Sequence, residues 1–318
     1  MSSSSSGNDP KDHHYVPAFY LREWESPKFG DKLIEFRRLD TPRGKVLGEK
    51  EVSARATGFQ KDLYSISTSD PMIKDRSFEK GFLSDLDNRA SQVLKHLLSD
   101  ARVLDESFRE QWAQFVVAQM RRSPEEVAAS ERGYQYAWER PPPELEEWYR
   151  QVWVPGLPKT LAEITKDTPK HELQKMQQDS LKDAVRDGLV VRCVRGLNWR
   201  TRRLKRAKYS LLTSDRPVFC NNRLSHPDGF LFVPLSPEVV FFAQPQGARA
   251  HPIFETGSDN KVVRFCNQIV VGQAHQYVWA ADKQQVSFVT RRIGHDRKKS
   301  FNEIAIEAYR ELLAQGSS

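Results

Sequence analysis

The chain has 318 residues, 38% of them hydrophobic, with 7 Trp and 17 Phe. It can therefore bury a core in one large or two ordinary domains. The formal net charge of +7 and the pI of about 9.2 favour a polyanionic partner without establishing one. The 3 cysteines are widely spaced, which excludes a disulfide framework and a zinc-knuckle spacing, so a cytoplasmic protein is expected.

Residues 1–10 are rich in serine and lack the basic start and apolar middle of a secretory signal. We interpret them as a disordered leader or a cloning remnant. The longest apolar runs, such as residues 239–243, have the length of strands and are too short to span a membrane. We therefore expect a soluble protein that does not bind membranes.

The N-terminal segment, residues 11–76, carries a histidine motif followed by aromatic residues. Pro17 and the residues at 19–21 and 24 predict a short helix. Residues 33–39 alternate as in a strand, and residues 41–44 are typical of a turn. Residues 58–65 resemble a second strand or a tight loop, so we expect a small hairpin that frames the histidines.

Apolar residues at intervals of three and four predict a helical body over residues 77–195. The expected helices cover residues 77–100, 105–123, 125–139, 144–153 and 171–187. Asp105 or Ser107 can cap the second of these, Pro124 stops it, and the prolines at 141–143 end the third.

Residues 196–318 are expected to form a β-rich region with a closing helix. The predicted strands cover residues 208–213, 230–233, 239–242 and 277–280, and the predicted helices cover residues 259–272 and 301–313. The predicted fold class is α+β, with a central helical body followed by a largely antiparallel sheet region and a C-terminal helix. We expect these segments to form one integrated globular unit.

Two adjacent histidines, His13 and His14, follow Asp12 and precede Tyr15 and Pro17. Imidazoles bind metals and transfer protons near neutral pH, so this pair is a candidate catalytic site. The alternative is structural: the histidines cap backbone groups at the start of a helix, and the aromatic residues after them form a semi-buried plug.

Asp215 and Arg122 are further candidates for a site. Asp215 follows the strand predicted at 208–213, a position where metal ligands and catalytic acids are commonly placed. Its alternative is an Asx-turn that satisfies local N–H groups. Arg122 ends a predicted helix and either clamps an anionic group or interacts with the last carbonyls of that helix.

The segment from residue 188 to residue 214 contains no acidic residue and eight basic ones. If it forms a strand, four of these share one face and are suited to phosphates, namely Arg200, Arg202, Arg206 and Lys208. If it forms a hairpin with a turn near residue 205, the same charges are a solvated tip that protects a sheet edge. We predict substrate binding at these four residues.

Several motifs resemble a bacterial family known as domain of unknown function 4238. They are His13-His14-Tyr15-Val16-Pro17 with Phe19-Tyr20-Leu21, Gln119 with Arg122-Ser123-Pro124, Thr213-Ser214-Asp215-Arg216-Pro217-Val218, Pro234-Leu235-Ser236-Pro237 and Asn267. The resemblance covers most of the ordered chain. It implies family membership and implies no activity.

The opening motif is also similar to the first element of the His-Asn-His nucleases. That similarity implies that His14 is a general base and that His13 or Asp12 is a metal ligand. Those nucleases place an asparagine and a final histidine in one compact unit, whereas here no asparagine occurs between Asp12 and Asn88.

Two hypotheses follow from the sequence. The first is a metal-assisted phosphodiesterase acting on RNA or DNA, with Mg²⁺, Mn²⁺ or Zn²⁺. In it His14 is the base, His13 and Asp215 are metal ligands or acids, and Arg122 holds phosphate together with the basic segment. The second is a non-catalytic binding or sensor module, with a structural histidine-aromatic plug and a basic surface for its partner.

Overall fold

The computed structural model describes residues 11–42, 44–67, 74–99, 105–166, 168–221, 224–249, 251–297 and 299–316. The predicted α+β fold class is confirmed, because a run of helices is followed by antiparallel strands and a C-terminal helix, α12 (Phe301–Gly316). Every strand pair in the described part of the chain is antiparallel.

The central body is helical, as predicted, and its helices follow one another with short connections. They are the π-helical segment η4 (Phe78–Leu83), α2 (Ser84–Leu98), α3 (Glu106–Arg121), α4 (Pro124–Glu139), α5 (Pro143–Val152), α6 (Leu161–Lys166), α7 (Lys170–Asp187) and α8 (Leu189–Gly196). The side chain of Asp105 caps α3 by accepting the Phe108 N–H at 2.8 Å. Pro124 is the first residue of α4, where its missing N–H costs nothing.

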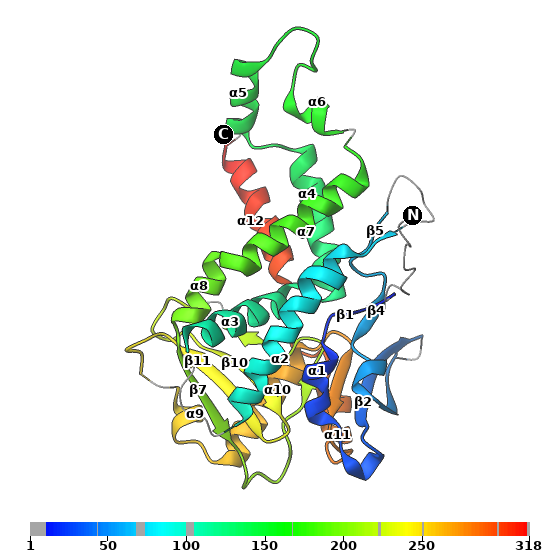
Figure 1. Ribbon diagram of the computed structural model, residues 1–318, viewed down its shortest axis with the longest axis vertical. Coiled ribbons are helices and arrows are strands. Elements are labelled where there is room, and N and C mark those ends of the chain that lie inside the picture. Colours follow the sequence, from blue (N-terminus) through cyan, green and yellow to red (C-terminus); the bar gives the residue numbers. More distant parts are fainter. Residues whose placement is uncertain are drawn as a thin grey trace, which may run out of the picture.

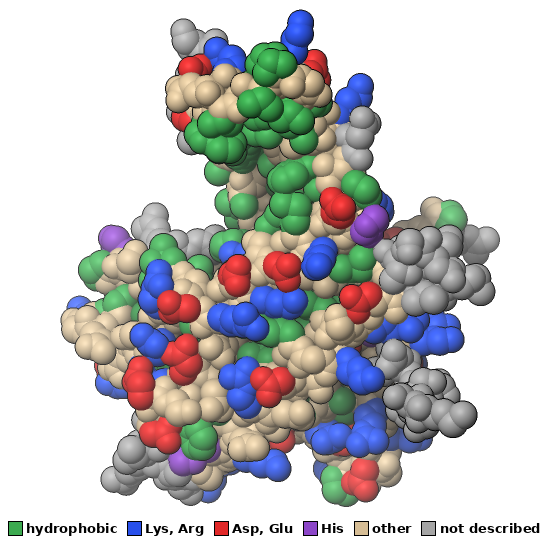
Figure 2. All heavy atoms as spheres, turned by 45° about the horizontal axis from the view of Figure 1, so that its top comes forward, with side chains coloured by type: hydrophobic (Ala, Val, Ile, Leu, Met, Phe, Trp, Pro, Cys, Tyr) green, Lys and Arg blue, Asp and Glu red, His purple; other side chains and the backbone are tan. Residues whose placement is uncertain are grey.

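Helices α4, α5, α6, α7 and α12 form a stalk that rises from a wider body holding the sheets (Figure 1). Apolar side chains gather at the tip of this stalk (Figure 2). The exposed ones from α5 and the residues after it are Leu145, Trp148, Val152, Trp153, Val154 and Leu157. No helix in the described ranges has both the length and the apolar character needed to cross a bilayer.

One four-stranded sheet joins the two ends of the chain. Its strands, in spatial order, are β3 (Gly44–Val52), β2 (Leu33–Thr41), β12 (Tyr277–Ala280) and β8 (Thr213–Ser214). The strands predicted at 33–39 and 277–280 are confirmed, and they pair with each other so that Phe36 lies opposite Val278. The N-terminal and C-terminal segments therefore share a sheet, while the domain boundaries given above stay a prediction.

The second four-stranded sheet belongs to the C-terminal half. Its order is β7 (Asn198–Arg203), β11 (Val239–Gln244), β10 (Leu231–Ser236) and β9 (Phe219–Cys220), which confirms the strands predicted at 230–233 and 239–242. Two smaller pairs join β1 (Asp12–His14) to β4 (Phe59–Lys61), and β5 (Ile66–Ser67) to β6 (Lys74–Asp75). The histidines thus lie on a strand that pairs across the intervening hairpin of β2 and β3.

The prediction of a strand at 208–213 is wrong, since only Thr213 belongs to a strand. The residues before it run alongside the helix α10 (Asp259–Gln273) as irregular chain. Side chains of α10 replace the partner strand as hydrogen-bond acceptors. The bonds run from the Arg206 N–H to Asp259, from the Lys208 N–H to Asn260 and from the Leu212 N–H to Asn267. A segment whose donors are satisfied in this way needs no strand ladder.

The remaining helices surround the sheets. They are α1 (Ala18–Leu21) and η1 (Arg22–Trp24), η2 (Pro27–Phe29), η3 (Ala54–Ala56), α9 (Pro252–Glu255) and α11 (Val286–Arg292). The helices predicted at 259–272 and 301–313 are confirmed as α10 and α12.

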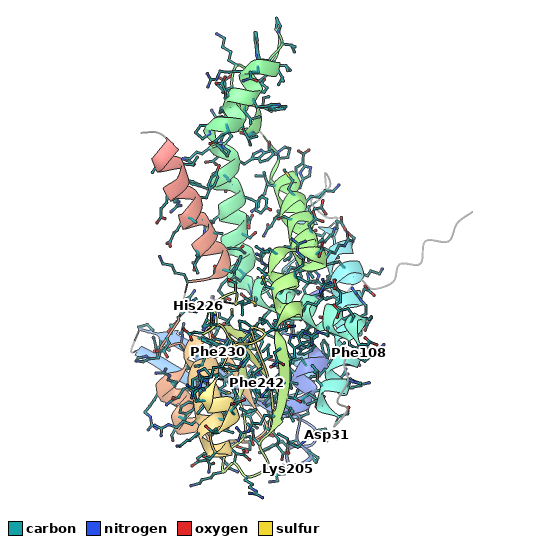
Figure 3. All side chains as sticks on the ribbon, turned by 90° about the vertical axis from the view of Figure 1, so that its left-hand side faces the viewer. Asp31, Phe108, Lys205, His226, Phe230 and Phe242 are labelled. Carbon is teal, nitrogen blue, oxygen red and sulfur yellow. The ribbon has the colours of Figure 1, made fainter. Side chains whose placement is uncertain are left out.

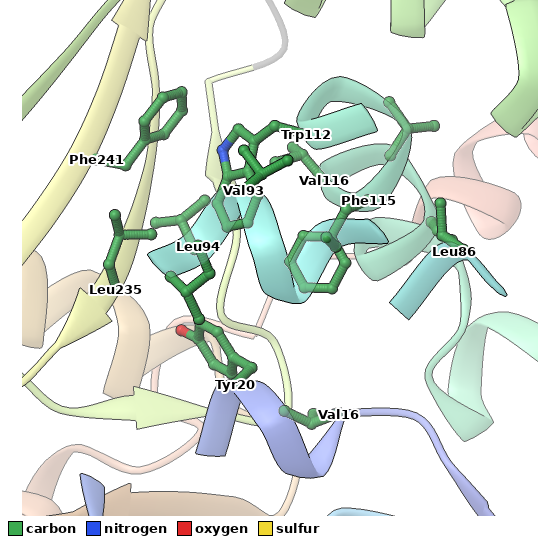
Figure 4. Packing of buried hydrophobic residues seen from close by; sticks show 14 of the residues in the cluster. Val16, Tyr20, Leu86, Val93, Leu94, Trp112, Phe115, Val116, Leu235 and Phe241 are labelled. Carbon is green, nitrogen blue, oxygen red and sulfur yellow. The ribbon is translucent and has the colours of Figure 1, made fainter. Parts of the chain in front are cut away.

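The largest core cluster joins α1, α2 and α3 to strands β10 and β11. Figure 4 shows Tyr20, Leu94 and Trp112 facing Leu235 and Phe241 across this junction. Tyr20 is fully buried, and its hydroxyl donates to the Pro234 carbonyl at 2.6 Å. The aromatic half of the opening motif therefore docks the N-terminus into the core.

A second core cluster lies between the sheet of β10 and β11 and helix α10. Phe230, Phe232, Phe242 and Phe254 meet there, and the rings of Phe242 and Phe254 stack with centroids 4.6 Å apart. Figure 3 labels Phe230 and Phe242 inside the body, with Lys205 at its lower edge. This packing fixes α10 against the sheet, so residues 206–212, which run alongside α10, have a rigid support.

Candidate functional site

His13 is a buried part of the fold. The pairing of β1 with β4 turns its ring into the protein, where the side chain is 0% exposed. Its Nδ1 accepts the backbone N–H of Tyr64 at 3.0 Å, and the two rings stack with centroids 5.7 Å apart. Because the lone pair of Nδ1 is used by this hydrogen bond, that nitrogen holds the Tyr64 loop in place.

His14, the next residue of β1, is only partly buried and packs against Phe59. Burial lowers the pKa of its imidazole, a hydrogen bond to the backbone of Arg55 opposes this shift, and the charge of Arg122 adds to it. The net shift is downward and favours the neutral ring. Its Nε2 is buried and has no hydrogen-bond partner among the described residues. Of the two histidines, His14 thus keeps a nitrogen that is able to accept a proton.

Arg122 is the C-cap of α3, as predicted, and its side chain is 0% exposed. Its Nε and Nη2 donate to Oε1 of Gln119 at 2.9 and 2.6 Å, and its Nη1 donates to Oδ1 of Asp87 at 2.8 Å. Gln119 in turn donates to the Tyr15 carbonyl at 2.8 Å. The guanidinium therefore ties α2, α3 and the opening motif together.

Asp215 follows β8 and is 3% exposed. Its carboxylate accepts three backbone N–H groups, from His275 at 2.8 Å, Gln276 at 2.6 Å and Tyr277 at 2.8 Å. The pKa of Asp215 is raised to about 6, first by burial and then by the negative charge of Glu125, while the three N–H donors oppose the shift. The carboxylate thus holds the start of β12, which is far away in sequence and is not part of a local turn.

Asp215 also lines a cavity of about 160 Å³ under α12. The polar groups around this cavity bind other parts of the protein. Glu126 accepts the N–H groups of Phe301 and Asn302 at 2.6 and 3.0 Å, and Ser123 caps α4. The cavity is therefore largely a junction between α4, α12 and β8.

The structure arranges the predicted catalytic residues in two groups. His14 and Arg122 lie with Glu79, whose carboxylate hydrogen bonds the His14 backbone N–H. Asp215 lies beside Glu125 and His275, where Nε2 of His275 is 3.1 Å from Oε1 of Glu125. Within the described ranges, no three His, Cys, Asp or Glu side chains are arranged to hold a metal ion.

The basic segment contains paired and unpaired cations. On β7, Arg200 forms an ion pair with Glu255 at 3.1 Å, and Arg202 forms one with Asp259 at 2.9 Å. Arg202 also donates to the carbonyl of Phe254 in α9 and to that of Gly257 after it, so it is a structural residue. Arg206 is exposed in the following turn, and Lys208 reaches a groove beside α10.

This groove has a volume of about 510 Å³ and lies between the segment around Tyr209, α10 and α11. Its lining has three exposed cations, Lys208, Arg264 and Arg291, and no acidic residue. None of these cations forms an ion pair with a carboxylate in the part of the chain that the structure describes. The remaining lining is mainly aromatic and amide, from Tyr209, Phe288, Asn260, Gln268 and Gln284.

Two buried amides form the floor of the groove. Asn267 accepts the Leu212 N–H at 2.9 Å and donates to the Ser210 carbonyl at 2.9 Å and to Gln285 at 3.0 Å. Gln285 donates to the same Ser210 carbonyl at 2.8 Å. This network fixes the segment that carries Lys208 and Tyr209 relative to α10 and α11.

Sequence reasoning selected Lys208 and Asn267 but missed Arg264 and Tyr209 as parts of one groove. A signal was present, because Asn260, Arg264 and Asn267 recur at intervals of four and three and so share one side of the helix predicted at 259–272. The contribution of α11 has no such signal, since only the fold brings Arg291 to this side of α10.

Comparison with known proteins gives one result. Residues 12–284 match a family model described as a protein of unknown function (DUF4238). Searches of curated proteins and of solved structures returned no match. The matched range includes the opening motif, residues 206–212 and α10, and it ends before α11.

Proposed function

The chain belongs to the family of proteins of unknown function DUF4238, and we propose that it is a non-catalytic binding module for a phosphate-bearing polyanion. The proposed binding surface is the groove between α10 and α11. In this proposal the histidine motif holds the fold together and does not contact the ligand.

The observation that carries the proposal is the set of unpaired cations in a groove without acids. Lys208, Arg264 and Arg291 face the same hollow and have no carboxylate partner among the described residues. Cations that are not already neutralised gain most from phosphate, because binding releases counterions from the polyanion. The fork of an arginine also matches phosphate with two parallel hydrogen bonds.

The surroundings of the predicted catalytic residues support the same proposal. His13 and Asp215 direct polar atoms at backbone N–H groups, and Arg122 directs its guanidinium at Gln119 and Asp87. Such contacts stabilise a fold without requiring a substrate.

A binding assay tests the proposal. Fluorescence anisotropy with labelled single-stranded RNA and DNA of roughly 12 nucleotides is measured between about 50 and 200 mM salt. We expect affinity to fall with salt, and each of Lys208→Ala, Arg264→Ala and Arg291→Ala to weaken binding and to reduce the slope of log K against log salt by about 0.7.

The matched control is Arg200→Ala, which removes a cation from the same basic segment that is already paired with Glu255. We expect this variant to bind almost as the unmodified protein does. Absence of binding at the lowest salt would overturn the proposal. It would equally be overturned if Arg200→Ala weakened binding as much as Arg264→Ala.

A metal-assisted phosphodiesterase centred on His14 is the second candidate. The observation that favours it is the buried Nε2 of His14, which has no hydrogen-bond partner among the described residues and belongs to a neutral ring. A neutral imidazole of this kind is a competent general base. Incubation of the bound strand with Mg²⁺, Mn²⁺ or Zn²⁺ tests it, and cleavage that disappears in a folded His14→Ala variant would establish it. Intact strands with every ion would exclude it.

A further inference from the structure

We infer that the groove between α10 and α11 is a seat for an unpaired nucleotide, in which a base packs on Tyr209 while its phosphate meets the three cations. The preferred ligand is then a single strand, because the paired bases of a duplex cannot pack on this ring. This inference rests on the proposed function, because it assigns a specific ligand to the same groove.

The first support is the aromatic surface. The side chain of Tyr209 is 41% exposed although its neighbours in the chain are held firmly. The Lys208 N–H donates to Asn260 at 2.7 Å, and the Ser210 carbonyl accepts from Asn267 and Gln285. A rigid backbone on both sides presents the ring at low entropic cost, and an exposed ring of this kind is the platform on which bases stack.

The second support is the position of positive charge beside that ring. The ammonium of Lys208 lies 5.2 Å from the centre of the Tyr209 ring, so cation and ring form one continuous surface. A nucleotide is complementary to this surface, because it carries a flat base next to a negatively charged phosphate. Arg264 on α10 and Arg291 on α11 extend the positive charge along the groove.

The third support is the set of amide and hydroxyl groups in the lining. Asn260, Gln268 and Gln284 carry carboxamides and Ser287 carries a hydroxyl, and these groups both donate and accept hydrogen bonds. The edges of an unpaired base offer donors and acceptors of the same kind. A site for phosphate alone would use only the donors of these groups, whereas a base can use their acceptors as well.

The shape of the groove distinguishes single strands from duplexes. A hollow of about 510 Å³ is in the size range of pockets for small ligands. In a duplex the bases are stacked inside the helix and cannot reach Tyr209, whereas an unpaired base can leave its neighbours and enter the hollow. Duplexes are therefore expected to bind only through phosphates.

The test compares ligands that have the same number of phosphates and differ in their bases. Binding of a pyrimidine strand of roughly 12 nucleotides is compared with that of an abasic strand of the same length and with a hairpin duplex that has the same number of phosphates. We expect the pyrimidine strand to bind roughly tenfold more tightly than the abasic one. Tyr209→Ala should remove this preference with an unchanged salt slope, and Tyr209→Phe should keep it.

Each outcome separates this inference from the proposed function. Equal, salt-dependent affinity for pyrimidine and abasic strands, or for duplex and single strand, overturns the nucleotide seat and leaves the polyanion module standing. Absence of binding to every strand at low salt overturns both. Uridine monophosphate is also tested as a competitor. If it competes as efficiently per nucleotide as the strand does, the ligand of the groove is a free mononucleotide.

Discussion

Two arginines of this protein have the same guanidinium and opposite surroundings. Arg122 is 0% exposed and directs three hydrogen bonds at Gln119 and Asp87. Arg264 is exposed on α10 and lines a groove that has no acidic residue. The difference teaches that the motif easiest to recognise in the sequence is engaged in holding the fold. The residues available to a ligand are dispersed along the chain and meet only in the folded protein.

Arg122→Met should produce the largest loss of stability. The substitution leaves the carboxylate of Asp87, which is 20% exposed, without its cation and leaves the buried Oε1 of Gln119 without donors. Breaking a buried ion pair by removing one partner typically costs about 3–5 kcal/mol. The measurement is the free energy of unfolding from urea titration followed by circular dichroism.

The control for this prediction is Arg150→Met. Arg150 pairs with Glu147 at 2.8 Å on the stalk, but the two side chains are 66% and 53% exposed. An exposed pair contributes within about 1 kcal/mol. If the two variants lost equal stability, Arg122 would not stabilise the junction between α2, α3 and the opening motif.

Asp215→Ala should have the next largest effect. It removes the acceptor of three N–H groups at the start of β12, and one buried donor left without a partner typically costs about 1–3 kcal/mol. Residues 275–277 are only partly buried, so water can replace some of these bonds, and we expect a total loss of about 1–3 kcal/mol. Asp215→Asn keeps one oxygen and should lose less stability. Hydrogen exchange at His275 and Tyr277 checks the assignment, because protection there should fall more than elsewhere in the chain.

Glu79→Gln should change the pH dependence of stability. The pKa of Glu79 is raised to about 7, mainly because the carboxyl group is buried. The charge of Arg122 opposes this shift and the charge of Asp87 adds to it. A carboxyl group whose folded pKa is raised stabilises the protein below the unfolded pKa near 4.3, and this contribution is lost as pH rises to about 7. The unmodified protein should therefore lose more stability than Glu79→Gln does between about pH 4 and pH 8, a range that includes both pKa values. Parallel curves would contradict the assignment.

Much of the fold could be predicted from local pattern. The periodicity of Phe78, Leu86 and Leu94 and the prolines at Pro124 and Pro141 placed the helices of the body within a few residues. The strand at 277–280 was also placed correctly. These elements can be predicted from the sequence because one face of each is apolar over its whole length.

What could not be predicted depends on contacts between distant segments. Residues 208–212 look like a strand, yet their donors bind Asn260 and Asn267 on a helix that follows much later. The sequence of residues 208–212 contains no local signal for hydrogen-bond acceptors on a distant helix. The partners of Asp215 were hidden for the same reason, because its N–H donors lie 60 to 62 residues further along the chain. The type of a residue alone therefore does not show whether its side chain is buried and stabilises the fold or is exposed and available to a ligand.

The smallest effect on stability is expected for the groove cations, and it tests the comparison most directly. Lys208→Ala, Arg264→Ala and Arg291→Ala should each change the free energy of unfolding by no more than about 0.5 kcal/mol, because all three side chains are exposed and none is paired with a carboxylate among the residues that the structure describes. Their triple variant should fold normally and fail to bind the strand that Arg200→Ala still binds. If instead the triple variant were as unstable as Arg122→Met, the groove would be part of the structural framework. The distinction between the two arginines would then no longer hold, since both would serve the fold.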